Sequence, residues 1–207
     1  MTSRDPPRAS PEARDLRQEC VRQAMAIIAE KGVEGLSMRD VARRLGVSHQ
    51  APYKHFPSRD HILAEIVATA YAEFAAHLDA RERSDDPYED LGSMGRAYFD
   101  YAQREPLKYR LMFGTPLPDP AEHPEMIQRG RHAFSLLEEA IAQLHRSQGR
   151  PGEREAVELD AMFVWSTVHG MAAIRETEAQ KNLCLEGRAN EAMAEHALNL
   201  IGRALAP

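Results

Sequence analysis

The sequence predicts an all-α fold of about nine helices, and three observations support this prediction. Apolar residues recur at helical spacing in one segment after another, as they do along residues 21–28. No segment has the sustained alternation of apolar and polar residues that is typical of strands. Most of the 13 prolines lie in the N-terminal tail, in the stretch 116–124, or where a helix would begin. These prolines divide the chain into helical segments.

The helices can be predicted in order from these breaks. The first ends near Gly32, and a short second helix runs from Met38 to Leu45. We expect Ser37 to cap the second helix, with Asp40 three residues later completing a capping box. Further helices are expected over residues 49–56, 58–79, 88–104, 106–113, 121–147, 153–178 and 188–205.

The composition excludes several classes of protein. No apolar run is long enough for a transmembrane helix, and residues 1–14 lack the apolar core of a secretory signal, so we expect a cytoplasmic protein with no membrane partner. Cys20 and Cys184 have no CxxC-type neighbour and are expected to be packed thiols. The sequence has no HExxH motif, no close ligand cluster and no Gly-rich phosphate loop, so no enzyme, metal or cofactor is predicted. The scattered His123, His132 and His145 are expected to be solvated.

The charge is divided unevenly along the chain. The net charge is −6 overall, but residues 1–60 carry +3 and residues 61–207 carry −9. Within residues 36–59 five basic side chains face one acidic one. Such a basic segment either is a solvated face or binds an anion such as nucleic acid.

Residues 37–56 fit a helix-turn-helix. Gly46 follows the first helix at a position that usually needs a positive φ. Ser48 is expected to cap a second short helix, His49–Phe56, and the small Ala42 lets the two helices pack closely. A helical hairpin with a basic exterior is the alternative interpretation.

The second helix of this motif would present polar side chains to the major groove of DNA. Gln50 can form paired hydrogen bonds with adenine, while His49 and Lys54 can donate to guanine or phosphate. Four further residues (Ser37, Tyr53, His55 and Arg59) are suited to phosphates. The residues expected at the DNA are Ser37, Arg39, Ser48, His49, Gln50, Ala51, Tyr53, Lys54, His55 and Arg59.

The stretch Gly46–Leu63, with the pattern G-V-S-x-x-A-P-Y-x-H-F-P-S-R-D-x-I-L, closely resembles the DNA-binding signature of TetR-type transcriptional regulators. The resemblance spans about residues 14–63 and departs from the signature in two places. Pro52 replaces the usual aliphatic residue, and Arg59 stands where lysine is common. Pro52 forfeits about one backbone hydrogen bond near the start of the expected helix.

The resemblance implies a homodimer whose C-terminal helical domain carries a ligand cavity and the dimer interface. It implies a helix-turn-helix DNA-binding domain over residues 14–60 and an effector-binding and dimerisation domain over 61–207, after a tail over 1–13 that we expect to be disordered. The segments Trp165–Gly170 and Tyr109–Gly114 resemble a TetR-type subclass with a Trp-His-Gly motif. A glycine inside a helix costs about 1 kcal/mol relative to alanine, so Gly170 suggests close approach of another helix or a ligand.

An interior rich in aromatic residues and methionine suggests an apolar or amphipathic effector, although such residues can also be simple core. The ligand contacts are expected to be Tyr98, Tyr101, Tyr109, Met112, Phe113, Phe134, Phe163, Thr167 and Met171. The dimer interface is expected to include Trp165, His169, Met193, Ala197, Leu200 and Ile201. Trp165 and His169 share a helix face, and ligand contact is the alternative for this pair.

An isologous dimer of this kind would read a palindromic operator. The expected function is a repressor that its ligand releases from DNA by shifting the population of conformations. The alternative is a DNA-binding factor of the same fold with no small-molecule effector.

Overall fold

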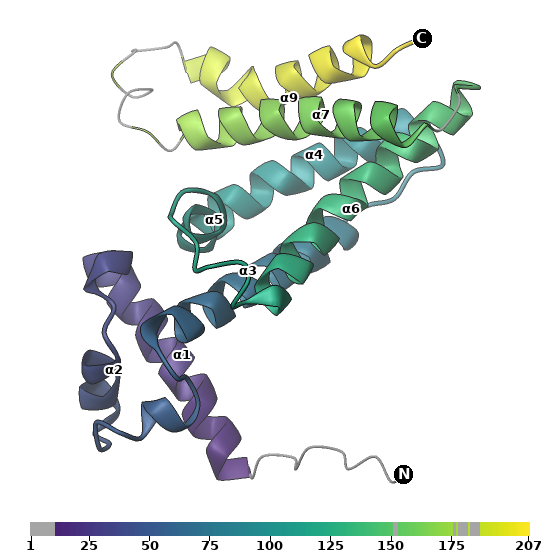
Figure 1. The fold of residues 1–207 in the computed structure, drawn as a ribbon. Helices are drawn as coiled ribbons and strands as arrows, with labels where there is room; N and C mark the ends of the chain where they lie inside the picture. Colours follow the sequence, from purple (N-terminus) through teal and green to yellow (C-terminus); the bar gives the residue numbers. More distant parts are fainter. Residues whose placement is uncertain (1–10, 151–152, 176, 178–181, 183–186) are drawn as a thin grey trace, which may run out of the picture. The chain divides into compact units, whose positions relative to one another are not determined.

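The structure, a computed structural model, describes residues 11–150, 153–175, 177, 182 and 187–207. Over these residues the chain forms eight α-helices and two 3₁₀ helices and has no strand, which confirms the all-α prediction (Figure 1). The elements are α1 (Pro11–Lys31), the 3₁₀ helix η1 (Val33–Gly35), α2 (Met38–Leu45), the 3₁₀ helix η2 (Pro52–Lys54), α3 (Arg59–Asp79), α4 (Pro87–Arg104), α5 (Pro106–Phe113), α6 (Pro124–Ser147), α7 (Arg154–Arg175) and α9 (Gly187–Ala204).

Prolines and side-chain caps mark where the helices begin. Ser58 caps α3, since its Oγ accepts from the N–H of His61 at 3.3 Å. The start predicted for the helix after the proline-rich stretch was wrong by three residues. The side chain of Asp119 accepts from the N–H of Ala121 at 2.9 Å, and this turn occupies the chain until Pro124 takes the first position of α6.

The chain groups into two compact units. The first unit contains the described part of Met1–Thr69 together with Leu111–Ile127, and the second contains Ala70–Arg110 with the described part of Gln128–Pro207. The borders fall within α3, α5 and α6. The functional boundary expected at residue 60 stays a prediction.

The core of the first unit is aliphatic. Ile27 and Ile28 of α1, Val41 of α2, and Ile62 and Val67 of α3 are buried to 1% exposure or less. Burying side chains of this size stabilises a fold by about 1.5–3 kcal/mol each relative to leaving them exposed. The three helices of this unit are therefore held mainly by shared apolar packing.

In the second unit α4, α7 and α9 pack against one another, and α7 and α9 lie side by side (Figure 1). Gly95 of α4 permits close approach, because a Cβ placed there would lie 2.2 Å from a methyl carbon of Leu198 on α9. Ala197 and Ile201 of α9 and Val164 of α7 are buried in the same interior.

Two histidines expected in solvent are buried, so that expectation was wrong for His123 and His145, whereas His132 is exposed. His145 lies on the inward face of α6 and its Nε2 is 2.8 Å from Asp160 Oδ2. The ring of His123 packs edge-on against that of His61, with centroids 4.8 Å apart.

Cys20 is a fully buried thiol in α1, as predicted, and burial raises its pKa. Cys184 lies outside the described residues. Within the described chain, no helix combines the length and the apolar character needed to cross a bilayer. No group of three or more potential metal ligands occurs among the same residues.

Candidate nucleic-acid interface and buried tyrosine–histidine cluster

Helix α2 is capped at both ends as the sequence predicted. The Oγ of Ser37 accepts from the N–H of Asp40 at 3.1 Å. Gly46 has φ of +66°, and the following Val47 donates its N–H to the carbonyl of Ala42 at 3.1 Å. Together these bonds satisfy backbone groups that a helix end would otherwise leave open. The position of the turn after α2 is therefore closely defined.

The α-helix predicted over His49–Phe56 is wrong. The chain forms a turn that leads into the 3₁₀ helix η2, and the carbonyl of Ser48 accepts from Ala51 at 3.0 Å, three residues on. An α-helix would need a donor four residues on, but Pro52 has no N–H. Pro52, one of the two departures noted in the sequence, is therefore the reason.

Side chains on both sides of Pro52 face solvent. The rings of His49 and Tyr53 contact each other with centroids 5.6 Å apart, while Ala51 and His55 are half-buried. We call the exposed residues of this segment the reading surface, which consists of Ser48, His49, Gln50, Tyr53 and Lys54.

The remaining residues expected at DNA have different surroundings. Arg39 is exposed, whereas Ser37 is half-buried and forms the cap described above. The guanidinium of Arg59 donates to two backbone carbonyls, those of Val33 at 2.5 Å and Leu36 at 3.1 Å. Arg59 thus ties the start of α3 to the segment that leads into α2.

Other arginines of the first unit join its helices. Arg17 pairs with Glu65 at 2.6 Å and lies 5.1 Å from the centre of the Phe56 ring. Arg44 of α2 pairs with Glu30 of α1. Part of the basic charge counted from the sequence is therefore neutralised inside the unit, and this could not be seen from the number of charges.

A polar cluster of two buried tyrosines and two half-buried rings occupies the second unit, and we call it the tyrosine–histidine cluster: Tyr98, Tyr109, Trp165 and His169. The hydroxyl of Tyr109 is 2.7 Å from His169 Nδ1 and 3.0 Å from the hydroxyl of Tyr98. The Trp165 indole donates to the Tyr98 hydroxyl, and its ring lies 5.8 Å from that of His169. The two matched residues of the Trp-His motif thus meet on one pair of tyrosines.

The cluster favours the uncharged form of each member. In the tautomer of neutral His169 that carries its proton on Nε2, Nδ1 accepts from the Tyr109 hydroxyl. Burial lowers the pKa of His169, and burial raises the pKa of Tyr109 to about 12. The pKa of Tyr98 is raised further, first by burial and then by Tyr109. The charged form of each group would need solvation that the interior does not supply.

The other expected ligand contacts are only partly brought together. Tyr101 is buried and donates to the carbonyl of Ala70 at 3.2 Å, and Phe134 contacts the Trp165 ring. Phe163 is 44% exposed, and its carbonyl accepts from Thr167 at 2.9 Å. Met171 is half-buried. Two residues, Met112 and Phe113, group with the first unit rather than the second.

The residues expected at a dimer interface divide into two groups. Trp165 and His169 are half-buried in the tyrosine–histidine cluster, and Ala197 and Ile201 are buried within the unit. Leu200 is 46% exposed, and Met193 is half-buried.

An exposed apolar stripe along α7 was missed by the sequence reasoning. Leu159, Met162, Phe163 and Ile174 are each 44–64% exposed and follow helical spacing. Gly170 lies in the same row, and a Cβ placed there would meet no atom of the described residues within 4 Å. The sequence shows the helical period of these residues, but it does not show which face of the helix stays exposed in the fold.

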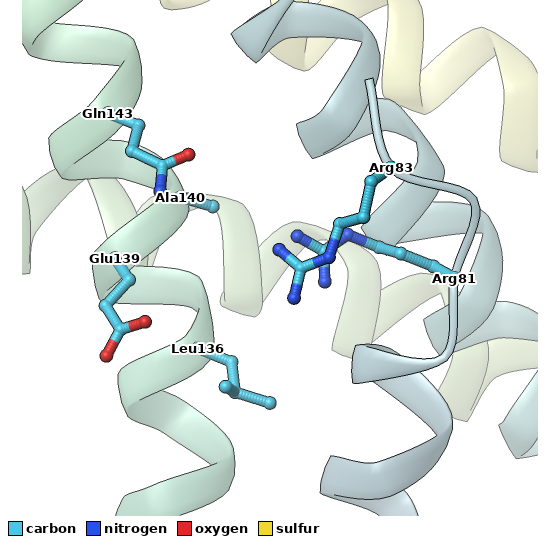
Figure 2. A pocket seen from close by; sticks show the side chains of 6 residues that line it. All are labelled: Arg81, Arg83, Leu136, Glu139, Ala140 and Gln143. Atoms are coloured by element: carbon cyan, nitrogen blue, oxygen red, sulfur yellow. The ribbon is translucent and has the colours of Figure 1, made fainter. Parts of the chain in front are cut away.

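A small polar cleft lies in the second unit (Figure 2). Arg81 and Arg83 point into it from the segment after α3, opposite Glu139 and Gln143 of α6. Arg81 forms a buried ion pair with Asp90 at 2.6 Å. The charged lining of the cleft differs from the apolar site that the sequence suggests for an effector.

Comparison with known proteins identifies related chains. The family described as bacterial regulatory proteins, tetR family, matches residues 21–66. The HTH-type transcriptional regulator Rv1816 of Mycobacterium tuberculosis is 33% identical over 94 residues, which is 44% of this chain and 40% of the relative. The repressor KstR of Mycolicibacterium smegmatis is 30% identical over 95 residues, 45% of this chain and 47% of KstR. The chain thus spans less than half the length of these curated relatives.

Solved structures extend the similarity over nearly the whole fold. PfmR, a TetR family transcriptional regulator of Thermus thermophilus, matches with a TM-score of 0.64 and 26% identity over 91% of this chain and 99% of PfmR. A protein of Rhodococcus sp. RHA1 has the same fold, with a TM-score of 0.73 and 24% identity over 93% of this chain and 96% of that protein. The tetracyclin repressor-like C-terminal domain matches residues 91–200, more than half of the chain. The chain therefore belongs to the tetR family of bacterial regulatory proteins.

Proposed function

We propose that this chain is a cytoplasmic transcriptional repressor that binds a palindromic operator as a homodimer and leaves it when a small ligand binds. The observation that carries the proposal is the reading surface, whose polar side chains follow an α2 that is capped at both ends. A fixed turn with exposed polar groups is what base recognition in a major groove requires. The name of the relative KstR, a transcriptional repressor, supports the direction of regulation.

Within the reading surface each side chain suits a different contact. Gln50 can bond adenine through both amide atoms, and His49 and Lys54 can donate to guanine or phosphate. Tyr53 and the exposed Arg39 can contact phosphates and so fix the register on the duplex. Ser37 and His55 are assigned to phosphates as well.

The exposed stripe of α7, together with Leu200 of α9, is assigned to the dimer interface. Large exposed apolar rows commonly mark contacts between proteins. A glycine within a helix lowers its stability, and Gly170 is not needed for packing inside the chain, so close approach of a partner helix explains it. A sedimentation measurement on the Gly170→Leu variant should find a monomer; an unchanged dimer would contradict the assignment.

The aromatic interior of the second unit is assigned to an apolar or amphipathic ligand. Its tyrosine hydroxyls and imidazole provide the few polar groups that orient ligands in apolar sites. Ligand binding would act through a difference in affinity between two conformations, with a coupling of about 1–3 kcal/mol. No catalytic step is assigned to this chain.

Selection of bound DNA tests the function directly. The purified chain is mixed with fragments of the source genome, and the retained fragments are sequenced. We expect enrichment of a palindrome whose half-sites lie about one turn of duplex apart. The Gln50→Ala variant should change the preference at one position of each half-site by about 1–3 kcal/mol. Gln103→Ala, an exposed change in the second unit, is the control. Wild-type protein that enriches no sequence would contradict DNA recognition.

A further inference from the structure

The backbone around Pro52 differs from that of a recognition α-helix. Pro52 lies next to the residues proposed to contact bases, so this difference affects where their side chains point. We propose that Pro52 is a specificity-determining residue that acts by positioning His49 and Gln50. It sets the winding of the segment and thereby decides which base edges these two side chains reach. The inference rests on the proposed binding of DNA.

The hydrogen bonds of the segment begin with the 3₁₀ pattern, and only at its end does Phe56 also donate to the carbonyl of Pro52, four residues back, at 3.0 Å. The carbonyl of Ser48 accepts from Ala51 at 3.0 Å, that of Ala51 from Lys54 at 3.2 Å, and that of Pro52 from His55 at 3.0 Å. The missing N–H at position 52 is the donor that Ser48 would need for an α-helical bond. The start of the helix therefore moves from position 49 to position 52, where a proline is readily accommodated.

The ring of Pro52 is anchored while its neighbours are free to contact DNA. Pro52 is among the fully buried side chains, and η2 packs against α1 and α2. Phe56, four residues on, is only 2% exposed. Any change in winding therefore has to be expressed at the solvent side, where His49, Gln50 and Tyr53 lie.

The winding changes where these side chains point. Each residue in 3₁₀ rather than α geometry turns the next side chain by about 20° more and carries it about 0.5 Å farther along the axis. The contact between the His49 and Tyr53 rings, with centroids 5.6 Å apart, couples the orientation of His49 to this geometry. Paired hydrogen bonds to a base edge do not tolerate displacements of this size, so a different winding reads a different base.

Two substitutions restore the missing donor. Pro52→Val keeps an apolar, branched side chain in the buried position, and Pro52→Ala serves if valine does not fit. Pro57→Val is the matched control, because Pro57 is exposed outside the segment. Each protein is used for DNA selection from a random duplex pool, for the salt dependence of binding, and for amide exchange by NMR.

We expect the amide at position 52 to be protected in both variants and the base preference to change roughly tenfold at one or two positions per half-site. The salt dependence should stay the same, because no phosphate contact is lost. The same preference as wild type, a uniform loss of binding, or an unprotected amide at position 52 would each overturn the inference. The control should match wild type. If wild-type protein itself enriches no sequence, the proposed function fails, and this inference fails with it; an enriched wild-type palindrome with unchanged variants defeats the inference alone.

Discussion

The two units place their polar groups in opposite ways. In the first unit, charged side chains lie near the surface, where they pair across helices or donate to backbone carbonyls, as Arg44 and Arg59 do. In the second unit, the buried guanidinium of Arg81 pairs with buried Asp90, and two buried phenols bond each other and a half-buried imidazole. When a partner is lost, a surface group can form hydrogen bonds with water instead, whereas a buried group cannot. Single polar substitutions should therefore be mild in the first unit and severe in the second.

The largest expected effect is at the buried ion pair. Arg81 and Asp90 have side chains that are 2% and 7% exposed, so Arg81→Met leaves a carboxylate buried without its partner. We expect a loss of about 3–5 kcal/mol in the free energy of unfolding, measured with urea. Arg44→Met, which breaks the pair with Glu30 in the first unit, should cost at most about 1 kcal/mol.

Arg104→Met is the control for the buried pair, because Arg104 also pairs with an aspartate of the second unit, Asp100, but its side chain is 71% exposed. Adding Asp90→Asn to Arg81→Met should recover part of the loss. Equal losses for Arg81→Met and Arg44→Met would remove the contrast between the units.

A smaller effect is expected at the tyrosine–histidine cluster. Tyr109→Phe removes the hydroxyl that bonds His169 Nδ1 and should lower the free energy of unfolding by about 1–3 kcal/mol. The wild-type protein should also lose stability as the pH falls below about 6.5, the ordinary pKa of histidine. Burial lowers the pKa of folded His169, so the unfolded chain binds the proton first, and acid favours unfolding.

The same reasoning has the opposite sign for the tyrosines. Their folded pKa values are raised, to about 12 for Tyr109, so the unfolded chain loses its protons first. Stability should therefore decline again as the pH rises above about 10. The free energy of unfolding is measured from pH 5 to pH 11. In the His169→Phe variant it should fall less in acid than in the wild-type protein. An identical profile in that variant would exclude His169 as its source.

The smallest effect concerns the salt dependence of operator binding. Lys54→Met should reduce the salt slope by about one unit, as expected for a lost phosphate contact. Arg59→Met should weaken binding with little change in slope, because its guanidinium donates to Val33 and Leu36. A slope reduced equally by both variants would show that Arg59 contacts a phosphate after all.

Features with short-range causes could be predicted from the sequence. The caps by Ser37 and Gly46 depend on bonds that span five residues or fewer, so the residue types alone indicated them. Pro52 was recognised as the loss of one bond, but the change to 3₁₀ winding depends on which carbonyl finds another donor. These are local effects of backbone chemistry.

Features with long-range causes could not be predicted. The tyrosine–histidine cluster joins residues up to 71 apart in the chain, and spacing along one helix reveals only the pair Trp165 and His169. Similarly, residues 111–127 group with the first unit through packing such as that of His123 on His61, which no local pattern indicates. The burial of His145 has the same origin.

The single tryptophan of the chain lies in the tyrosine–histidine cluster, between the rings of Phe134 and His169. Intrinsic fluorescence excited at the indole band therefore reports on the second unit alone, because the first unit contains no indole. A compound that enters this interior should change the emission, whereas DNA bound at the reading surface contacts a unit that contains no indole. The protein thus carries its own optical probe with which candidate effectors can be screened without a label.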